Sequence, residues 1–178
     1  RISSQCFKRA LRRDPIFAKT TGVPISYRTL KIKKELTDRL AAMGLSPEDA
    51  AFRADEFAKN YSSKTAKINE KNPEQTNVLL FLSQAEIQEA ADGLAKLAGA
   101  AEIKKFAEDF AKNTKNRPGA PDIALFGRML ADRPETNVDA ACQVAHAIST
   151  HAVNMDIDFF TAVDDLQPKD ATGAGMMG

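Results

Sequence analysis

Apolar residues recur at helical spacing through most of this chain, and that periodicity most narrows the folds it can adopt. Apolar side chains every three or four residues place one buried stripe on each helix. Local signals agree with the pattern: Ser46-Pro47 is a typical helix start, and Ser83 with Glu86 forms a capping box. The periodicity predicts helices at about 4–13, 28–43, 46–61, 84–98, 100–114 and 138–152.

Two segments instead favour strands, 78–82 and 159–166, because β-branched, aromatic and other apolar residues dominate them. Two strands are too few for an independent sheet domain. The chain also does not begin with Met, so we expect a piece of a longer protein whose other strands lie elsewhere. The expected fold class is α+β, mostly helical in this piece. The segment 123–130 is short and apolar, and its state stays open.

The composition is that of a soluble globular protein, with 43% hydrophobic and 28% charged residues among 178. No apolar run approaches the roughly 20 residues that a membrane helix needs. Cys6 and Cys142 lie far apart without metal-type spacing, which argues against a disulfide framework or a zinc site. We therefore expect a cytoplasmic protein with reduced thiols and no membrane partner.

Charge is distributed unevenly, although the formal net charge is only +1. Residues 1–13 carry five basic side chains and no acid, whereas residues 134–178 carry seven acids and one lysine. Such a chain can bind a polyanion at its basic end and a second copy of itself at its acidic end. Two solvated ends fit the charges equally well.

The basic end falls on the first expected helix. Its polar side chains follow the spacing i, i+3, i+4 and i+7, which gives one continuous stripe, and its apolar positions are Phe7, Ala10 and Leu11. The free N–H groups of a helix start, with Ser hydroxyls beside them, attract an anion. Contacts to successive phosphates would be sequence-tolerant and salt-dependent. A solvated basic face is the alternative. The stripe consists of Gln5, Lys8, Arg9 and Arg12.

Four motifs in order resemble the CasC family, the repeated backbone subunit of type I-E Cascade. The helical region 22–116 resembles that family only in being helical, and Cys6 and Phe7 replace smaller, aliphatic residues of its pattern. The motifs are Arg-Ile-Ser-Ser-Gln at 1–5 with Lys-Arg-Ala-Leu-Arg at 8–12, Asp-Ile-Ala-Leu-Phe-Gly-Arg-Met at 122–129, Ala-His-Ala-Ile-Ser-Thr-His at 145–151, and Asp-Phe-Phe-Thr-Ala-Val-Asp-Asp-Leu at 158–166.

This resemblance implies an RRM-like palm with a large helical fingers insertion and a thumb. Copies of the subunit line up head to tail along CRISPR RNA, and each thumb displaces a nucleotide from the guide–target duplex. The implied partners are CRISPR RNA, target DNA through the guide duplex, other copies and other Cascade subunits. The implied domains are the first palm helix at 1–21, fingers at 22–135, palm helix and strand at 136–166, and the start of the thumb at 167–178.

The resemblance also implies the RNA-binding residues. The early helix would hold the RNA backbone, and a methionine would pack against displaced or stacked bases, where an apolar, polarizable thioether ignores base identity. Core filling is the alternative for that methionine, and Arg128 fits either a phosphate or a nearby acid. The expected residues are Arg1, Ser3, Gln5, Lys8, Arg9, Arg12, Arg128 and Met129.

The residues argue against catalysis. His146 and His151 are five apart and diverge on a helix, so they are not expected to share a metal, and His146 more simply satisfies a local hydrogen bond. Asp164 and Asp165 are adjacent on an expected strand, so they point to opposite faces, and the resemblance gives them a palm-to-thumb or subunit-contact role. We expect no catalytic residue, metal or cofactor. The alternatives are a metal-dependent ribonuclease using one of these aspartates, and a helical protein–protein module.

Overall fold

The computed structural model describes residues 2–65, 69, 72–117, 119–152, 154 and 163–166. Over these residues the chain is mostly helical with a small antiparallel sheet, which confirms the α+β class. None of the described helices is long and apolar enough to cross a membrane. The elements are α1 Ser4–Arg13, α2 Pro15–Thr21, β1 Tyr27–Thr29, α3 Ile32–Ala42, α4 Pro47–Ser62, β2 Leu80–Leu82, α5 Gln84–Leu94, α6 Ala100–Lys112, η1 Asn113–Asn116, α7 Pro121–Phe126 and η2 Pro134–Thr136.

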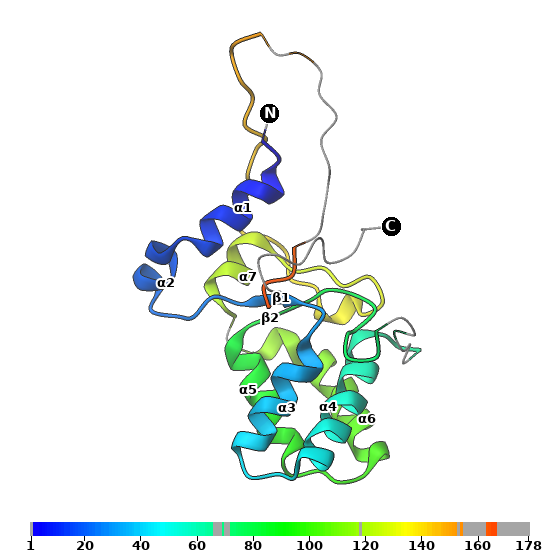
Figure 1. Cartoon of the computed structure of the whole chain (residues 1–178). Coiled ribbons are helices and arrows are strands. Elements are labelled where there is room, and N and C mark those ends of the chain that lie inside the picture. The colour runs from blue at the N-terminus through cyan, green and yellow to red at the C-terminus, as the bar shows by residue number, and fades with distance from the viewer. Residues whose placement is uncertain are drawn as a thin grey trace.

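Helices α3, α4, α5 and α6 pack together as a bundle (Figure 1). The expected caps set where two of them begin. The Ser46 hydroxyl accepts the Asp49 N–H at the start of α4, and Ser83 with Glu86 forms the full capping box of α5. Capping satisfies N–H groups that have no partner in the first turn of a helix. The four helices fall on the ranges that periodicity predicts, although α3 begins later and α5 ends earlier.

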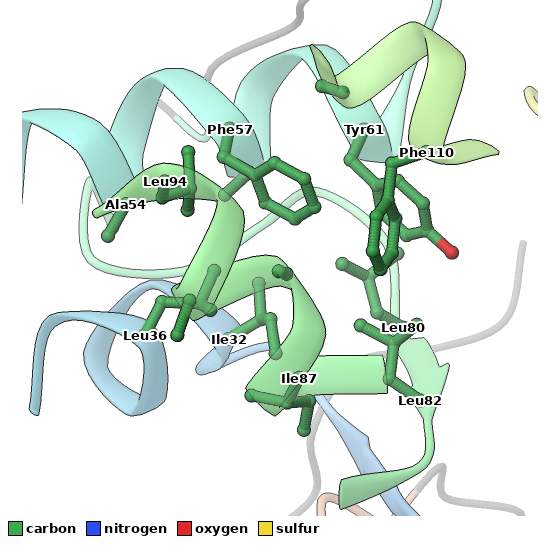
Figure 2. Close-up of a cluster of buried hydrophobic side chains, with 14 of the residues drawn as sticks. Ile32, Leu36, Ala54, Phe57, Tyr61, Leu80, Leu82, Ile87, Leu94 and Phe110 are labelled. Atoms are coloured by element: carbon green, nitrogen blue, oxygen red, sulfur yellow. The ribbon is translucent and has the colours of Figure 1, made fainter. Parts of the chain in front are cut away.

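The bundle core centres on aromatic rings from α4 and α6, as Figure 2 shows. Phe57 is fully buried and stacks on Tyr61 with ring centroids 5.4 Å apart, while the Phe110 ring meets Phe57 edge-on at 5.5 Å. Burial raises the pKa of Tyr61 to about 12, because the phenolate would have to form in an apolar interior. The bundle is thus a closed hydrophobic unit that can support other elements.

The sheet lies beside one end of this bundle (Figure 1), where β1 pairs with β2 in antiparallel register, Arg28 opposite Phe81. The β2 strand was expected. The β1 strand was not, because two of its three residues, Arg28 and Thr29, fall inside the stretch 28–43 that periodicity assigns to a helix. The helix starts only at Ile32, after Thr29 accepts the Lys31 N–H and turns the chain.

Two further differences concern short helices. No helix was predicted directly after 4–13, but Pro15 begins α2, with Asp14 accepting the Ile16 N–H as N-cap. Proline suits the first turn of a helix because its missing N–H would have no partner there. The open segment 123–130 is helical up to Phe126 and then turns at Gly127.

The expected helix at 138–152 is wrong. The described residues there run as an irregular extended segment, whose backbone bonds to other segments instead of to the preceding turn: Val138 bridges to Arg128, and Ala147 bridges to Ile2. Ile148 on the expected apolar stripe is exposed. Helices of this length depend on burying an apolar face, and the bundle core does not extend to this stripe.

The expected strand at 159–166 can be compared only in part. Residues 159–162 lie outside the described residues. Residues 163–166 form no strand; they make a turn beside β1, drawn in orange-red in Figure 1. The carboxylates of this turn accept N–H groups of β1 and of the residue after it, a role that the backbone of a paired strand would otherwise have.

Candidate nucleic-acid interface

Helix α1 begins as the sequence predicts. Ser3 is its N-cap, and the Ser3 hydroxyl oxygen accepts the Cys6 N–H at 3.2 Å. Gln5 is exposed and Lys8 is partly exposed, so both side chains reach solvent on the described surface. Arg1 lies outside the described residues. An RNA-binding role for these residues stays a prediction.

The orientation of α1 differs from that of an ordinary amphipathic helix. Its apolar residues are exposed, with Phe7 at 47% and Leu11 also open to solvent, whereas Arg12 on the polar stripe is buried. Figure 1 shows α1 standing to the side of the bundle, with α7 and the sheet nearest to it. The polar stripe therefore faces the rest of the chain at Arg12, while Gln5 at its other end is exposed to solvent.

Arg12 lies at the bottom of this contact, with 7% of its side chain exposed. Its guanidinium makes ion pairs with Asp165 at 2.9 Å and with Asp122 at 3.4 Å. The guanidinium also lies 4.4 Å from the centre of the Phe81 ring on β2, a cation–π distance. Arg12 thus joins α1 to the sheet and α7, and its predicted phosphate contact stays untested.

Asp165 is the centre of a basic cluster. We use the name α1–β1 arginine cluster for Arg9, Arg12, Arg13 and Arg28 with this carboxylate. The Asp165 side chain is only 2% exposed. Its Oδ1 accepts Arg9 at 3.4 Å and Arg13 at 3.3 Å, while its Oδ2 accepts Arg12 at 2.9 Å and the Arg28 backbone N–H at 3.0 Å.

Asp164 and Asp165 both accept backbone N–H groups along the same edge of β1. This corrects the expectation that they point to opposite faces. Asp165 exchanges two hydrogen bonds with the backbone of Arg28, through its carboxylate and through its own N–H. Asp164 Oδ2 accepts the Leu30 N–H at 2.7 Å, and its Oδ1 accepts the Leu166 N–H. The pair lies in a turn, so strand alternation does not apply, and both carboxylates cover the edge of β1 that β2 leaves open.

The field in the cluster is positive. The pKa of Arg28 is lowered, first by burial and next by the charge of Arg12, and Asp165 only partly offsets this. Burial alone would lower this pKa, so the sign of the field follows from the formal charges: the four arginines outnumber the two carboxylates, Asp165 and Asp122, that pair with them. The two half-exposed members, Arg9 and Arg13, bring that field to the surface.

Arg128 proves to pair with an acid, the second of the two options left open. Its Nη1 donates to both carboxylate oxygens of Glu86 at 3.0 Å and to the Phe81 carbonyl, and its Nε donates to the Thr136 carbonyl. Both side chains of the ion pair are almost fully buried. Arg128 therefore ties the segment after α7 to α5 and β2, and its implied contact with RNA stays a prediction.

Met129 points the other way, with 83% of it exposed. The alternation follows from the extended backbone at this bridge, which directs neighbouring side chains to opposite sides. The alternative of core filling does not fit such exposure. A large apolar side chain held in solvent by a buried neighbour suits contact with a base or another protein.

Gly127 makes this arrangement possible, which gives a first prediction. Its φ is +79°, and an added Cβ would lie 3.0 Å from the Val138 carbonyl oxygen. We expect Gly127→Ala to lower the free energy of unfolding by about 2 kcal/mol, from backbone strain and the close contact together. Denaturant unfolding measures this. Gly44→Ala is the matched control, because Gly44 also has positive φ but nothing lies within 4 Å of its added Cβ. Equal losses in the two variants would contradict a role for the contact.

The two histidines and the two cysteines all reach the surface of the described structure. His146 and His151 are both exposed on the irregular segment, so the helical argument about their spacing no longer applies. Cys6 is a free, exposed thiol and Cys142 is free and partly exposed. Within the described ranges, no group of three or more His, Cys, Asp or Glu side chains is placed to hold a metal ion.

Reasoning from the sequence missed four members of the interface. It assigned no role to Arg13, Arg28 or Asp122, and it considered Asp165 only for the nuclease alternative and for a palm-to-thumb or subunit contact. The available signal was the uneven charge distribution itself, because a basic first helix and an acidic last segment can pair within one chain. Instead, the acidic end was considered for contact with a second copy, whereas Asp165 pairs with α1 of its own chain.

Comparison with solved structures gives two informative likenesses. A chain described as "CRISPR RNA-guided surveillance complex" is 28% identical with a TM-score of 0.57, and the match covers 82% of this chain and 47% of that one. Another, described as "CRISPR RNA-guided surveillance complex, pre-nicking", is 30% identical with a TM-score of 0.56 and covers 100% and 51%. This chain thus spans about half the length of either relative. No curated protein matches it.

The fold and these likenesses support a Cas protein of the Cascade type. A family model described as "CT1975-like protein" matches residues 1–178, and the chain belongs to this family.

Proposed function

We propose that the chain is part of the CRISPR-RNA-binding backbone subunit of a type I-E Cascade complex, CasC. In this role it binds the phosphate backbone of the guide, oligomerises along it with other copies, and supports recognition of target DNA through the guide duplex. The RRM-like palm, the fingers and the thumb belong to this proposal, with the boundaries given above. The likeness to subunits of surveillance complexes supports it.

The observation that carries the proposal is the α1–β1 arginine cluster. Its ion pairs join three arginines to two aspartates, and Arg28 adds a fourth cation whose pKa is lowered. An anion that approaches Arg9 and Arg13 therefore meets excess positive charge. Lys8 lies on the same helix and extends the basic surface. A phosphate backbone is the anion that such a row of cations suits.

We also propose that the chain is not an enzyme. Asp165, which the nuclease alternative would use, is surrounded by guanidinium groups, where a divalent cation would be repelled. Each carboxylate oxygen of Asp164 accepts a hydrogen bond from a backbone N–H group. Both carboxylates thus already act as acceptors in contacts that hold the fold.

The test is guide binding by the full-length protein across a salt series, with Lys8→Glu and Arg9→Glu combined. We expect binding about 10-fold weaker or more, and a salt slope lower by about 0.7 for each lost phosphate contact with a single strand. Arg12 is left intact, because a glutamate there would face Asp122 and Asp165 in a buried position.

The control makes the same change in net charge elsewhere, with Lys104→Glu and Lys105→Glu on the exposed side of α6. In Figure 1, α6 lies in the bundle and α1 stands apart from it. Equal losses from the two double variants would mean that the protein senses only net charge. No loss from the α1 variant would reject the proposed interface and favour the helical protein–protein module.

A further inference from the structure

The two oxygens of the Asp165 carboxylate serve different parts of the cluster. Oδ2 faces inward, to the buried guanidinium of Arg12 and the backbone N–H of Arg28. Oδ1 faces the two exposed arginines, Arg9 and Arg13, at 3.4 and 3.3 Å. One oxygen therefore anchors the carboxylate in the fold while the other holds a pair of surface cations.

The two surface cations are suited to act together. Arg9 and Arg13 are four residues apart on α1, which places them one turn apart on the same side of the helix. Their side chains are 41% and 39% exposed, so both remain open to a ligand while they contact Oδ1. Each guanidinium carries five N–H donors, and a single contact to Oδ1 leaves most of them available. Without a shared acceptor, two cations at this spacing repel each other and sample many rotamers.

We propose that Asp165 is a positioning residue for RNA binding, which fixes Arg9 and Arg13 as one preorganised site for a backbone phosphate. This inference rests on the proposed function and deepens it. It assigns a role to an acidic residue in binding a polyanion, which charge alone would not suggest. The gain comes from side-chain order: each rotamer-rich side chain that binding must immobilise lowers affinity, and Asp165 immobilises two of them beforehand.

The carboxylate also determines which segment controls the site. Asp165 lies more than 150 residues after Arg9 and Arg12 in sequence, and its own N–H bonds to the Arg28 carbonyl. Its position is therefore set by the turn 163–166 and the edge of β1, and not by α1. The affinity for RNA therefore depends on the turn 163–166, which need not contact RNA itself.

The experiment measures guide RNA binding by the full-length protein with Asp165→Asn, against Asp164→Asn. Each variant removes one negative charge, and the two residues are adjacent in the same turn. Asp164 is the control because its carboxylate accepts backbone N–H groups, of Leu30 and Leu166. Electrostatics alone predicts that both bind RNA slightly more tightly. Positioning predicts that Asp165→Asn binds about 3- to 10-fold more weakly, from the freed rotamers of two arginines, while Asp164→Asn stays within about twofold of the original protein.

Two further variants separate positioning from a loss of folding. Asp165→Glu keeps the charge but moves the carboxylate, so it should also weaken binding. Arg13→Gln should weaken binding in the original protein and cost much less in the Asp165→Asn background, because the arginine is no longer held there. A merely structural role of Asp165 would leave the effect of Arg13→Gln unchanged among the molecules that remain folded.

The outcomes are distinguishable. If the original full-length protein binds no guide RNA, the proposed function fails. If it binds, and Asp165→Asn binds as tightly as Asp164→Asn or more tightly, the positioning role alone is overturned. Melting curves of each variant establish that equal folded fractions are compared.

Discussion

Replacing Arg128 by alanine should lower the free energy of unfolding by about 3–5 kcal/mol, as expected when one partner of a buried ion pair is removed. The change leaves the Glu86 carboxylate buried without its cation and removes the donors to the Phe81 and Thr136 carbonyls. Denaturant unfolding with a fixed m-value is the measurement. The size of this loss in unfolding free energy comes more from the unpaired Glu86 carboxylate than from the hydrogen bonds that are lost.

Neutralising both partners tests that reason. Arg128→Met combined with Glu86→Gln leaves neither of these two positions charged. The glutamine can still accept the Ser83 N–H as the capping box requires. We expect this double variant to recover most of the loss. A loss below about 1 kcal/mol for Arg128→Ala would mean that its guanidinium reaches solvent, and would favour its predicted contact with phosphate over the buried ion pair.

The second large effect belongs to Phe57, whose replacement by alanine should cost about 3–5 kcal/mol. Its ring is fully buried and packs against Tyr61, Phe106 and Phe110 at centroid distances of 5.4 to 5.9 Å. Removing it leaves a cavity that the rigid rings around it cannot fill. The midpoint of chemical unfolding should fall accordingly.

Phe52 provides the matched control, because it lies on the same helix but is exposed. Phe52→Ala should change the free energy of unfolding by less than about 0.5 kcal/mol. Similar losses for both phenylalanines would contradict the placement of the bundle core. The pair also separates the stability of the bundle from the proposed RNA binding, since neither residue belongs to the α1–β1 arginine cluster.

The bundle could be predicted from sequence because its signals are local. The caps at Ser46 and Ser83 and the apolar stripes act within a few turns, and they determine closely where α4, α5 and α6 begin. The same local logic failed at 138–152. The stripe there is as regular as the others, but a helix also needs a core to pack against, and that requirement depends on contacts distant in sequence.

The candidate site divides in the same way. The range of α1 and its polar stripe were predicted, because helix starts and periodicity are local signals. The inward orientation of Arg12 and the central place of Asp165 were not, since both depend on residues more than 100 positions away. The alternation of side chains along a strand gave a wrong prediction for Asp164 and Asp165, because they lie in a turn. Their carboxylates accept the backbone N–H groups that a neighbouring strand would otherwise pair with.

The separation in sequence between Asp165 and its partners sets an order for events during synthesis. The bundle is built from helices that neighbour one another along the chain, so it can fold as soon as residues up to α6 have left the ribosome. The turn 163–166 must then return across more than 130 positions to reach Arg28 and Leu30. The nascent chain therefore orders the α1–β1 arginine cluster only after its helical bundle is already stable.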